Sequence, residues 1–136
     1  MGAIMSSLTT LIKEASNFVS LHPANYADIQ AAEFQLGLSF ASDYKDYLLA
    51  FGAASFNGKE ITGICNSARL SVISVTERAR DLYPHFPKNV YVVEDLGFDN
   101  IIISQDSRGK VYSYGPSDSG TIIADSLQEY LFPGEK

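Results

Sequence analysis

The sequence has little cysteine, no tryptophan and no long apolar run. The single cysteine, Cys65, excludes an intramolecular disulfide and fits a reducing, cytoplasmic setting. No apolar stretch approaches the length of about 18 residues that a membrane-spanning helix needs, so we expect no membrane association. The first residues lack a basic segment followed by a long apolar one, which argues against a secretory signal. The stretch Met1–Ser6 matches the loose myristoylation pattern, but no polybasic second anchor follows it.

Basic residues are also scarce: 10 lysines and arginines stand against 16 acidic residues, for a net charge of −6. The imbalance lies mainly in residues 81–129, whereas residues 1–80 are nearly neutral. An acidic surface repels phosphates, which excludes direct nucleic-acid binding by counterion release. Such a surface either attracts a basic protein or serves only solubility, and the sequence leaves both open.

What the chain does have is apolar and aromatic content, 46% and 12% of its 136 residues. This composition predicts a packed core that needs neither disulfide nor metal, in one domain spanning residues 1–136.

Helical spacing of apolar residues dominates the first third of the chain. The predicted helices are 5–20, one between an N-cap at Asn25 and a stop at Gly37, and one between an N-cap at Ser42 and a stop at Gly52. The third helix carries a stripe of residues expected to be buried: Tyr44, Tyr47, Leu48 and Phe51.

Strand patterns follow, beginning with an Asn57-Gly58 pair that favours a two-residue hairpin turn. The predicted strands are 60–64, 70–75, 90–94, 100–104, 111–114 and 121–124, with a short helix inserted after Thr76, a tight turn at Asp106–Gly109 and a closing helix that begins with a capping box at Ser126–Glu129. Helices followed by a run of strands predict an α+β fold: an antiparallel-rich sheet packed against N-terminal helices, with a closing C-terminal helix.

No motif for a known chemistry is present. The chain lacks a Walker loop and a dinucleotide-binding glycine pattern, and its two histidines, His22 and His85, each lie beside proline. Together with Cys65 they are too dispersed in sequence to predict zinc. We therefore predict no catalytic, cofactor-binding or metal-binding residues, although a triad assembled by folding stays possible from sequence.

A mixture of tyrosines and carboxylates occurs late in the chain. Tyr112 and Tyr114 share one face of a strand, and Asp106 and Asp118 flank that strand in the turns. This combination is typical of a protein-binding surface for lysine and arginine. The alternative is that both tyrosines pack under the terminal helix.

With these residues in view, the chain resembles the SMI1/KNR4 family of the SUKH superfamily. The resemblance is carried by 29–52, "IQAAEFQLGLSFASDYKDYLLAFG", then by "VISVTERARDLYP", "VYVVEDLGFDNIIISQDSRGKVYSYG" and "DSLQEYLF" in order. It covers about residues 7–132. Ala41 departs from the pattern, since the family usually has proline there.

The resemblance implies the α+β fold and, for a short bacterial member, a cytoplasmic immunity protein that binds and neutralises a cognate polymorphic toxin domain, often a nuclease. It transfers no catalytic residue. The alternative is a general protein-interaction module without a toxin, and a homodimer stays open. The expected contacts with the basic toxin surface are Glu94, Asp95, Asp99, Asp106, Tyr112, Tyr114 and Asp118.

Overall fold

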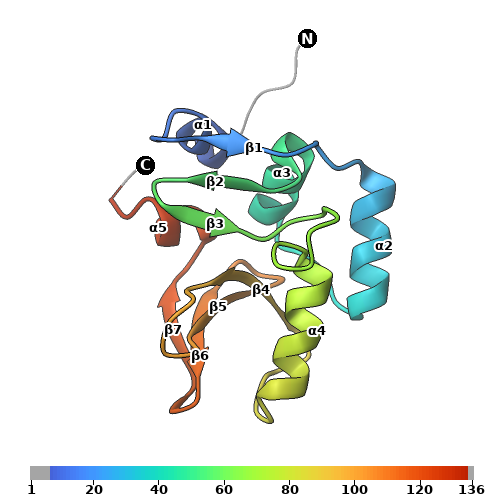
Figure 1. Ribbon diagram of the computed structural model, residues 1–136, viewed down its shortest axis with the longest axis vertical. Coiled ribbons are helices and arrows are strands. Elements are labelled where there is room, and N and C mark those ends of the chain that lie inside the picture. Colours follow the sequence, from blue (N-terminus) through green and yellow to red (C-terminus); the bar gives the residue numbers. More distant parts are fainter. Residues whose placement is uncertain (1–6, 135–136) are drawn as a thin grey trace.

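The chain forms an α+β fold in which helices and antiparallel sheets occupy separate segments (Figure 1). The computed structural model describes residues 7–134, and the Met1–Ser6 pattern lies outside them. Within this part, no helix is long and apolar enough to cross a membrane.

The strands form two sheets rather than the single sheet expected. The smaller sheet has the order β1 (Val19–Ser20), β2 (Ala54–Phe56) and β3 (Lys59–Ile61), and the larger has the order β4 (Val90–Asp95), β5 (Ile102–Asp106), β6 (Val111–Gly115) and β7 (Asp118–Ala124). All named strand pairs are antiparallel, as predicted. The sheets meet at Thr62, whose backbone N–H donates to Val93 O at 2.9 Å and whose hydroxyl donates to Val92 O at 2.7 Å.

The main core lies between the inner face of the large sheet and the helices α1 (Ser7–Lys13), α2 (Tyr26–Leu36), α3 (Ser42–Phe51) and α5 (Leu127–Leu131). The stripe predicted on α3 is buried. The Tyr47 hydroxyl donates to Ile61 O and accepts from Ala54 N, both at 2.7 Å, and the Tyr44 hydroxyl donates to Thr62 O at 2.9 Å. These buried hydroxyls fix α3 to the small sheet.

The first helix is shorter than predicted. The helix ends at Lys13, and Asn17 adopts a positive φ of 58°. Val19 of β1 then pairs with Ser55 of β2. Asn57 of the β2–β3 turn accepts from Ser16 N and donates its own N–H to Ser16 O. This long-range contact stabilises the extended chain against continuation of the helix. The predicted residues 5 and 6 of that helix lie outside the described part.

The predicted strand 70–75 is wrong, because residues 72–75 begin the helix α4 (Val72–Leu82). The Ser71 side chain caps it by accepting from Ser74 N at 3.2 Å. Val72, Val75, Thr76 and Ala79 recur at helical spacing and are buried. Burial of this face outweighs the strand preference of the β-branched residues.

We expect Ser71→Ala to lower the free energy of unfolding by about 1 kcal/mol, because the substitution removes the N-cap of α4. Urea denaturation measures the loss. The matched control is Ser42→Ala: Ser42 was predicted to cap α3, but the N-cap there is Ala41 and no side chain caps that end. Equal losses of stability in the two variants would contradict the assignment of Ser71 as the N-cap of α4.

Several turn and cap predictions are confirmed. Asn25 and Asp28 form a capping box on α2, and the two central residues of the Asn57-Gly58 turn have positive φ of 52° and 75°. At α5, Ser126 accepts from Glu129 N as predicted, but the Glu129 carboxylate accepts from Asp125 N instead of Ser126 N. The capping box there is therefore shifted by one residue in one of its two bonds.

Candidate functional site

The outer face of the large sheet is covered along only part of its width. One row of cross-strand partners runs Val92, Ser104, Tyr112 and Ile122 from β4 to β7. Helix α4 packs on the β4 side of this face, where Val75 and Ala79 join a second apolar cluster with Val90, Val92 and Ile102. On the β7 side Ile122 is 56% exposed and Tyr112 is half-buried. We call the pair Tyr112 and Ile122 the open face.

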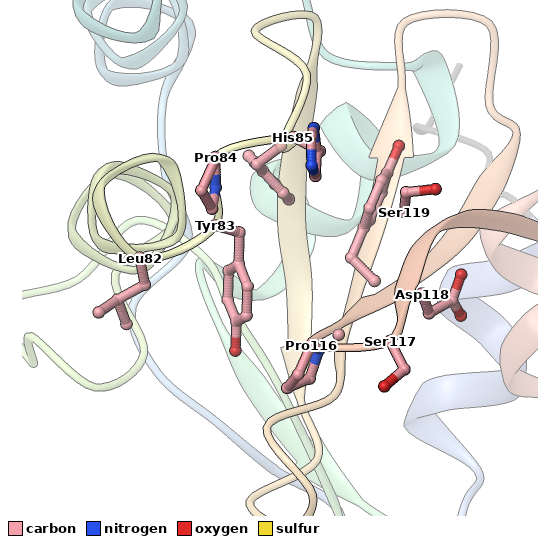
Figure 2. Close-up of a pocket in the computed structure, with 11 residues that line it drawn as sticks. Leu82, Tyr83, Pro84, His85, Pro116, Ser117, Asp118 and Ser119 are labelled. Atoms are coloured by element: carbon pink, nitrogen blue, oxygen red, sulfur yellow. The ribbon is translucent and has the colours of Figure 1, made fainter.

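Next to the open face lies a cleft of about 480 Å³, which we call the hairpin cleft. One wall is the chain that follows α4, Leu82–Phe86, and the other is the β6–β7 hairpin, Tyr114–Ser119. Figure 2 shows Leu82, Tyr83 and Pro84 across the cleft from Pro116, Ser117 and Ser119. Most of the lining is apolar or aromatic.

Tyr114 lies on the hairpin wall of this cleft and is itself buried. Its ring makes an edge-to-face contact with Phe86, with ring centroids 5.2 Å apart. On β7 the ring lies over Gly120, where a Cβ atom would come within 2.8 Å of a ring carbon. Burial raises the pKa of the Tyr114 hydroxyl to about 12. The expectation that both tyrosines pack under the terminal helix is wrong for Tyr114, because Phe86 covers it.

Three of the predicted contact residues gather at one end of the sheet. Asp95 and Asp99 lie at the β4–β5 connection, and Asp118 lies at the β6–β7 connection, where it begins β7. These two connections share one end of the sheet because the strands are antiparallel. Asp99 and Asp118 line one shallow depression of about 270 Å³. We call these three residues the carboxylate group.

The Asp118 carboxylate is held in place by two donors, Gly120 N at 3.1 Å and the Thr121 hydroxyl at 2.9 Å. These hydrogen bonds hold its pKa below the ordinary value, so Asp118 keeps its negative charge to a lower pH than an ordinary aspartate does.

Glu94 and Asp106 are not placed on that surface, which corrects the prediction. Glu94 is 5% exposed; its carboxylate accepts from the Tyr130 hydroxyl and lies 3.6 Å from Lys59 Nζ. Asp106 lies at the opposite end of β5, where its carboxylate accepts from Arg108 N, Lys110 N and the Tyr112 hydroxyl. Both carboxylates serve internal bonds. Burial and Asp106 together raise the pKa of Tyr112.

Folding also brings together reactive residue types that are distant in sequence. His22, Asp28 and Cys65 line one cleft of about 460 Å³, and His85 shares the hairpin cleft with Ser117, Asp118 and Ser119. However, Asp28 accepts from Asn25 N and the Cys65 thiol faces Ser67 O at 3.8 Å. Among residues 7–134, no group of His, Cys, Asp or Glu is arranged to hold a metal ion. Within the described residues, the hydrogen bonds of Asp28 and Cys65 therefore go to neighbouring backbone groups and do not connect the two side chains to His22.

Comparison with known families gives one match of nearly the whole chain. The sequence model of the family SUKH_5, described as SMI1-KNR4 cell-wall, matches residues 4–132. A comparison with curated proteins finds no match.

Proposed function

This chain belongs to the SMI1-KNR4 family of the SUKH superfamily, and on that basis we propose that it is an immunity protein that binds and neutralises a cognate toxin domain. Binding of a protein partner fits this family. The partner we propose is the basic nuclease domain of a polymorphic toxin, and the setting is the cytoplasm. Neutralisation occurs by covering the toxin's active surface, without chemistry on the toxin.

The observation that supports this proposal is the carboxylate group beside the open face. Asp95 and Asp99 are exposed, and the Asp118 carboxylate is held in place by Gly120 N and the Thr121 hydroxyl. A nuclease holds phosphates with lysine and arginine, so carboxylates at this end of the sheet can pair with the same groups and exclude the substrate. An interface of standard size, about 1,600 Å² in total, would cover the loops and the open face together.

Charge reversal at the carboxylate group tests the proposal. We expect Asp95→Lys with Asp99→Lys to slow association with the toxin at least tenfold at low salt and to weaken protection of growth, because both steering and pairing are lost. The matched control is Glu14→Lys with Asp46→Lys, two exposed positions that change the net charge equally. The partner is the product of the neighbouring reading frame, co-expressed with this chain, and the readouts are co-purification, association rate and growth.

Equal association and equal protection for the two double variants would contradict the electrostatic proposal. If the unsubstituted protein binds the neighbouring product but gives no growth protection, the general interaction module replaces the immunity function. Sedimentation of the protein alone determines whether it forms a homodimer.

A further inference from the structure

The acidic end of the sheet contains an apolar hollow that the charge argument does not use. We infer that the hairpin cleft is the anchor site for one large apolar side chain of the basic partner, presented between lysine or arginine residues. This inference rests on the proposed function and deepens it, because it assigns the partner's central contact to a cleft beside the carboxylate group.

The cleft has the size and lining of an anchor site. Its volume of about 480 Å³ lies within the range of pockets that hold small ligands, about 300–1,000 Å³. Leu82 stands at its edge with 63% of its surface exposed, although it is a large apolar residue. Burying such a residue together with a partner's side chain removes apolar surface from water on both sides. Interface hot spots cluster in pockets of this kind.

The walls are fixed before any partner arrives. Phe86 and Tyr114 hold each other in an edge-to-face contact, and Gly120 leaves the space that the Tyr114 ring fills. On the wall formed by Leu82–Phe86, the Tyr83 hydroxyl donates to Asn100 O at 2.8 Å, and Phe86 N donates to Tyr83 O at 3.0 Å. A preformed cleft loses little conformational entropy when it is filled, so less of the free energy of its apolar contact is offset by ordering of the cleft.

The charges around the cleft select the occupant. Asp118 lines the hairpin cleft and also the neighbouring depression that contains Asp99. An uncharged apolar segment would desolvate these carboxylates without pairing them, and an acidic segment would be repelled. A second copy of this chain is disfavoured by its net charge of −6. The occupant that satisfies both the cleft and its rim has an apolar side chain flanked by basic residues.

Three short peptides test this inference on the full-length protein. The probe is Lys-Lys-Leu-Lys-Lys, acetylated and amidated at its ends. The comparison peptides replace leucine by serine or every lysine by glutamate. We expect the leucine peptide to bind at least tenfold more tightly than either comparison peptide, measured by amide shifts in NMR titrations. The shifts should map to residues 82–86 and 114–119.

A matched pair of variants tests the cleft itself. Leu82→Ser should weaken binding of the leucine peptide at least fivefold, and Phe34→Ser should leave it unchanged, since Phe34 is 89% exposed on α2 and does not line the cleft. Both positions are exposed, so both variants should fold, and circular dichroism checks this.

Equal binding of the leucine and serine peptides would overturn the anchor. Equal binding of the lysine and glutamate peptides would overturn the basic flank, and no binding would overturn the inference as a whole. A dimer that Leu82→Ser dissociates in sedimentation would show that a second copy is the occupant, which also overturns it. In each case the proposed function stands if the unsubstituted protein still co-purifies with the neighbouring product and protects growth; absence of both defeats that function independently of the peptides.

Discussion

Replacing Tyr91 with phenylalanine should lower the free energy of unfolding by about 2–6 kcal/mol. The Tyr91 hydroxyl accepts from Ala41 N at 2.9 Å and donates to Gln105 Oε1 at 2.7 Å, and all three residues are buried. Phenylalanine fills the same space but leaves the Ala41 N–H and the Gln105 carbonyl without this partner. Each buried polar group that loses its hydrogen bond costs about 1–3 kcal/mol.

The effect should be large because Tyr91 belongs to a network that connects several elements. Gln105 Nε2 donates to Asp43 Oδ1 at 3.0 Å and to Gly109 O at 3.1 Å, and the other Asp43 oxygen accepts from Leu127 N at 2.9 Å. Loss of the hydroxyl therefore loosens the start of α3, the β5–β6 turn and the start of α5 together.

Urea denaturation at constant pH measures the loss, and Tyr26→Phe provides the matched control. Tyr26 is 70% exposed, so removal of its hydroxyl should change stability by less than about 0.5 kcal/mol. A loss below that limit in the Tyr91 variant would show that the network contributes little net stability.

The features that the sequence predicted correctly depend on neighbours within a few residues. The capping box of Asn25 and Asp28, the Asn57-Gly58 turn and the buried stripe on α3 are all of this kind. Each is specified by side chains that meet over one or two turns of chain, so spacing alone identifies it.

The features that were missed depend on contacts between distant segments. After Lys13 the chain leaves the helix through a turn and becomes extended at Val19, because Ser16 contacts Asn57, 41 positions later. Glu94 turns inward because Tyr130 of α5 supplies a hydroxyl donor, 36 positions later. Sequence spacing carries no information about such pairs, and therefore could not place Glu94 in the interior. Asp106 is a different case, because its donors Arg108, Lys110 and Tyr112 all lie within six positions of it.

The hairpin cleft was also beyond prediction. Its walls come from Leu82–Phe86 and Tyr114–Ser119, and it exists only because α4 and the β6–β7 hairpin end side by side (Figures 1 and 2). The pairing of Tyr112 and Tyr114 on one strand face suggested a binding surface, but folding turns Tyr114 into a wall and leaves Ile122 on the open face.

As the pH rises above 10, the free energy of unfolding should fall with a slope that reaches at least about 4 kcal/mol for each pH unit. Burial raises the pKa of Tyr44, Tyr47 and Tyr91 well above the ordinary value of 10.0. In the unfolded chain these tyrosines ionise near pH 10, whereas in the folded protein they stay protonated. Unfolding therefore releases protons, and rising pH favours it. Below about pH 9 both states are protonated and this contribution stays constant.

The size of the slope follows from the number of protons released. One proton corresponds to about 1.4 kcal/mol per pH unit, so the three fully buried hydroxyls alone give the predicted minimum. Burial also raises the pKa of Tyr114 and of Tyr130, and both hydroxyls make the slope steeper. Urea denaturation at pH 9, 10, 10.5 and 11 measures it, and tyrosinate absorbance should rise together with unfolding.

Tyr44→Phe separates this linkage from the loss of a hydrogen bond. The variant loses the bond to Thr62 O, which lowers stability at every pH, but it should also reduce the alkaline slope by about 1.4 kcal/mol per pH unit, the contribution of one proton. The free energy of unfolding below about pH 9 thus reports the loss of the hydrogen bond, and its slope against pH above about 10 reports the number of protons released. A stability that stays constant from pH 10 to pH 11, or a slope that Tyr44→Phe leaves unchanged, would mean that these hydroxyls ionise within the folded protein, and the core around α3 would then be open to solvent.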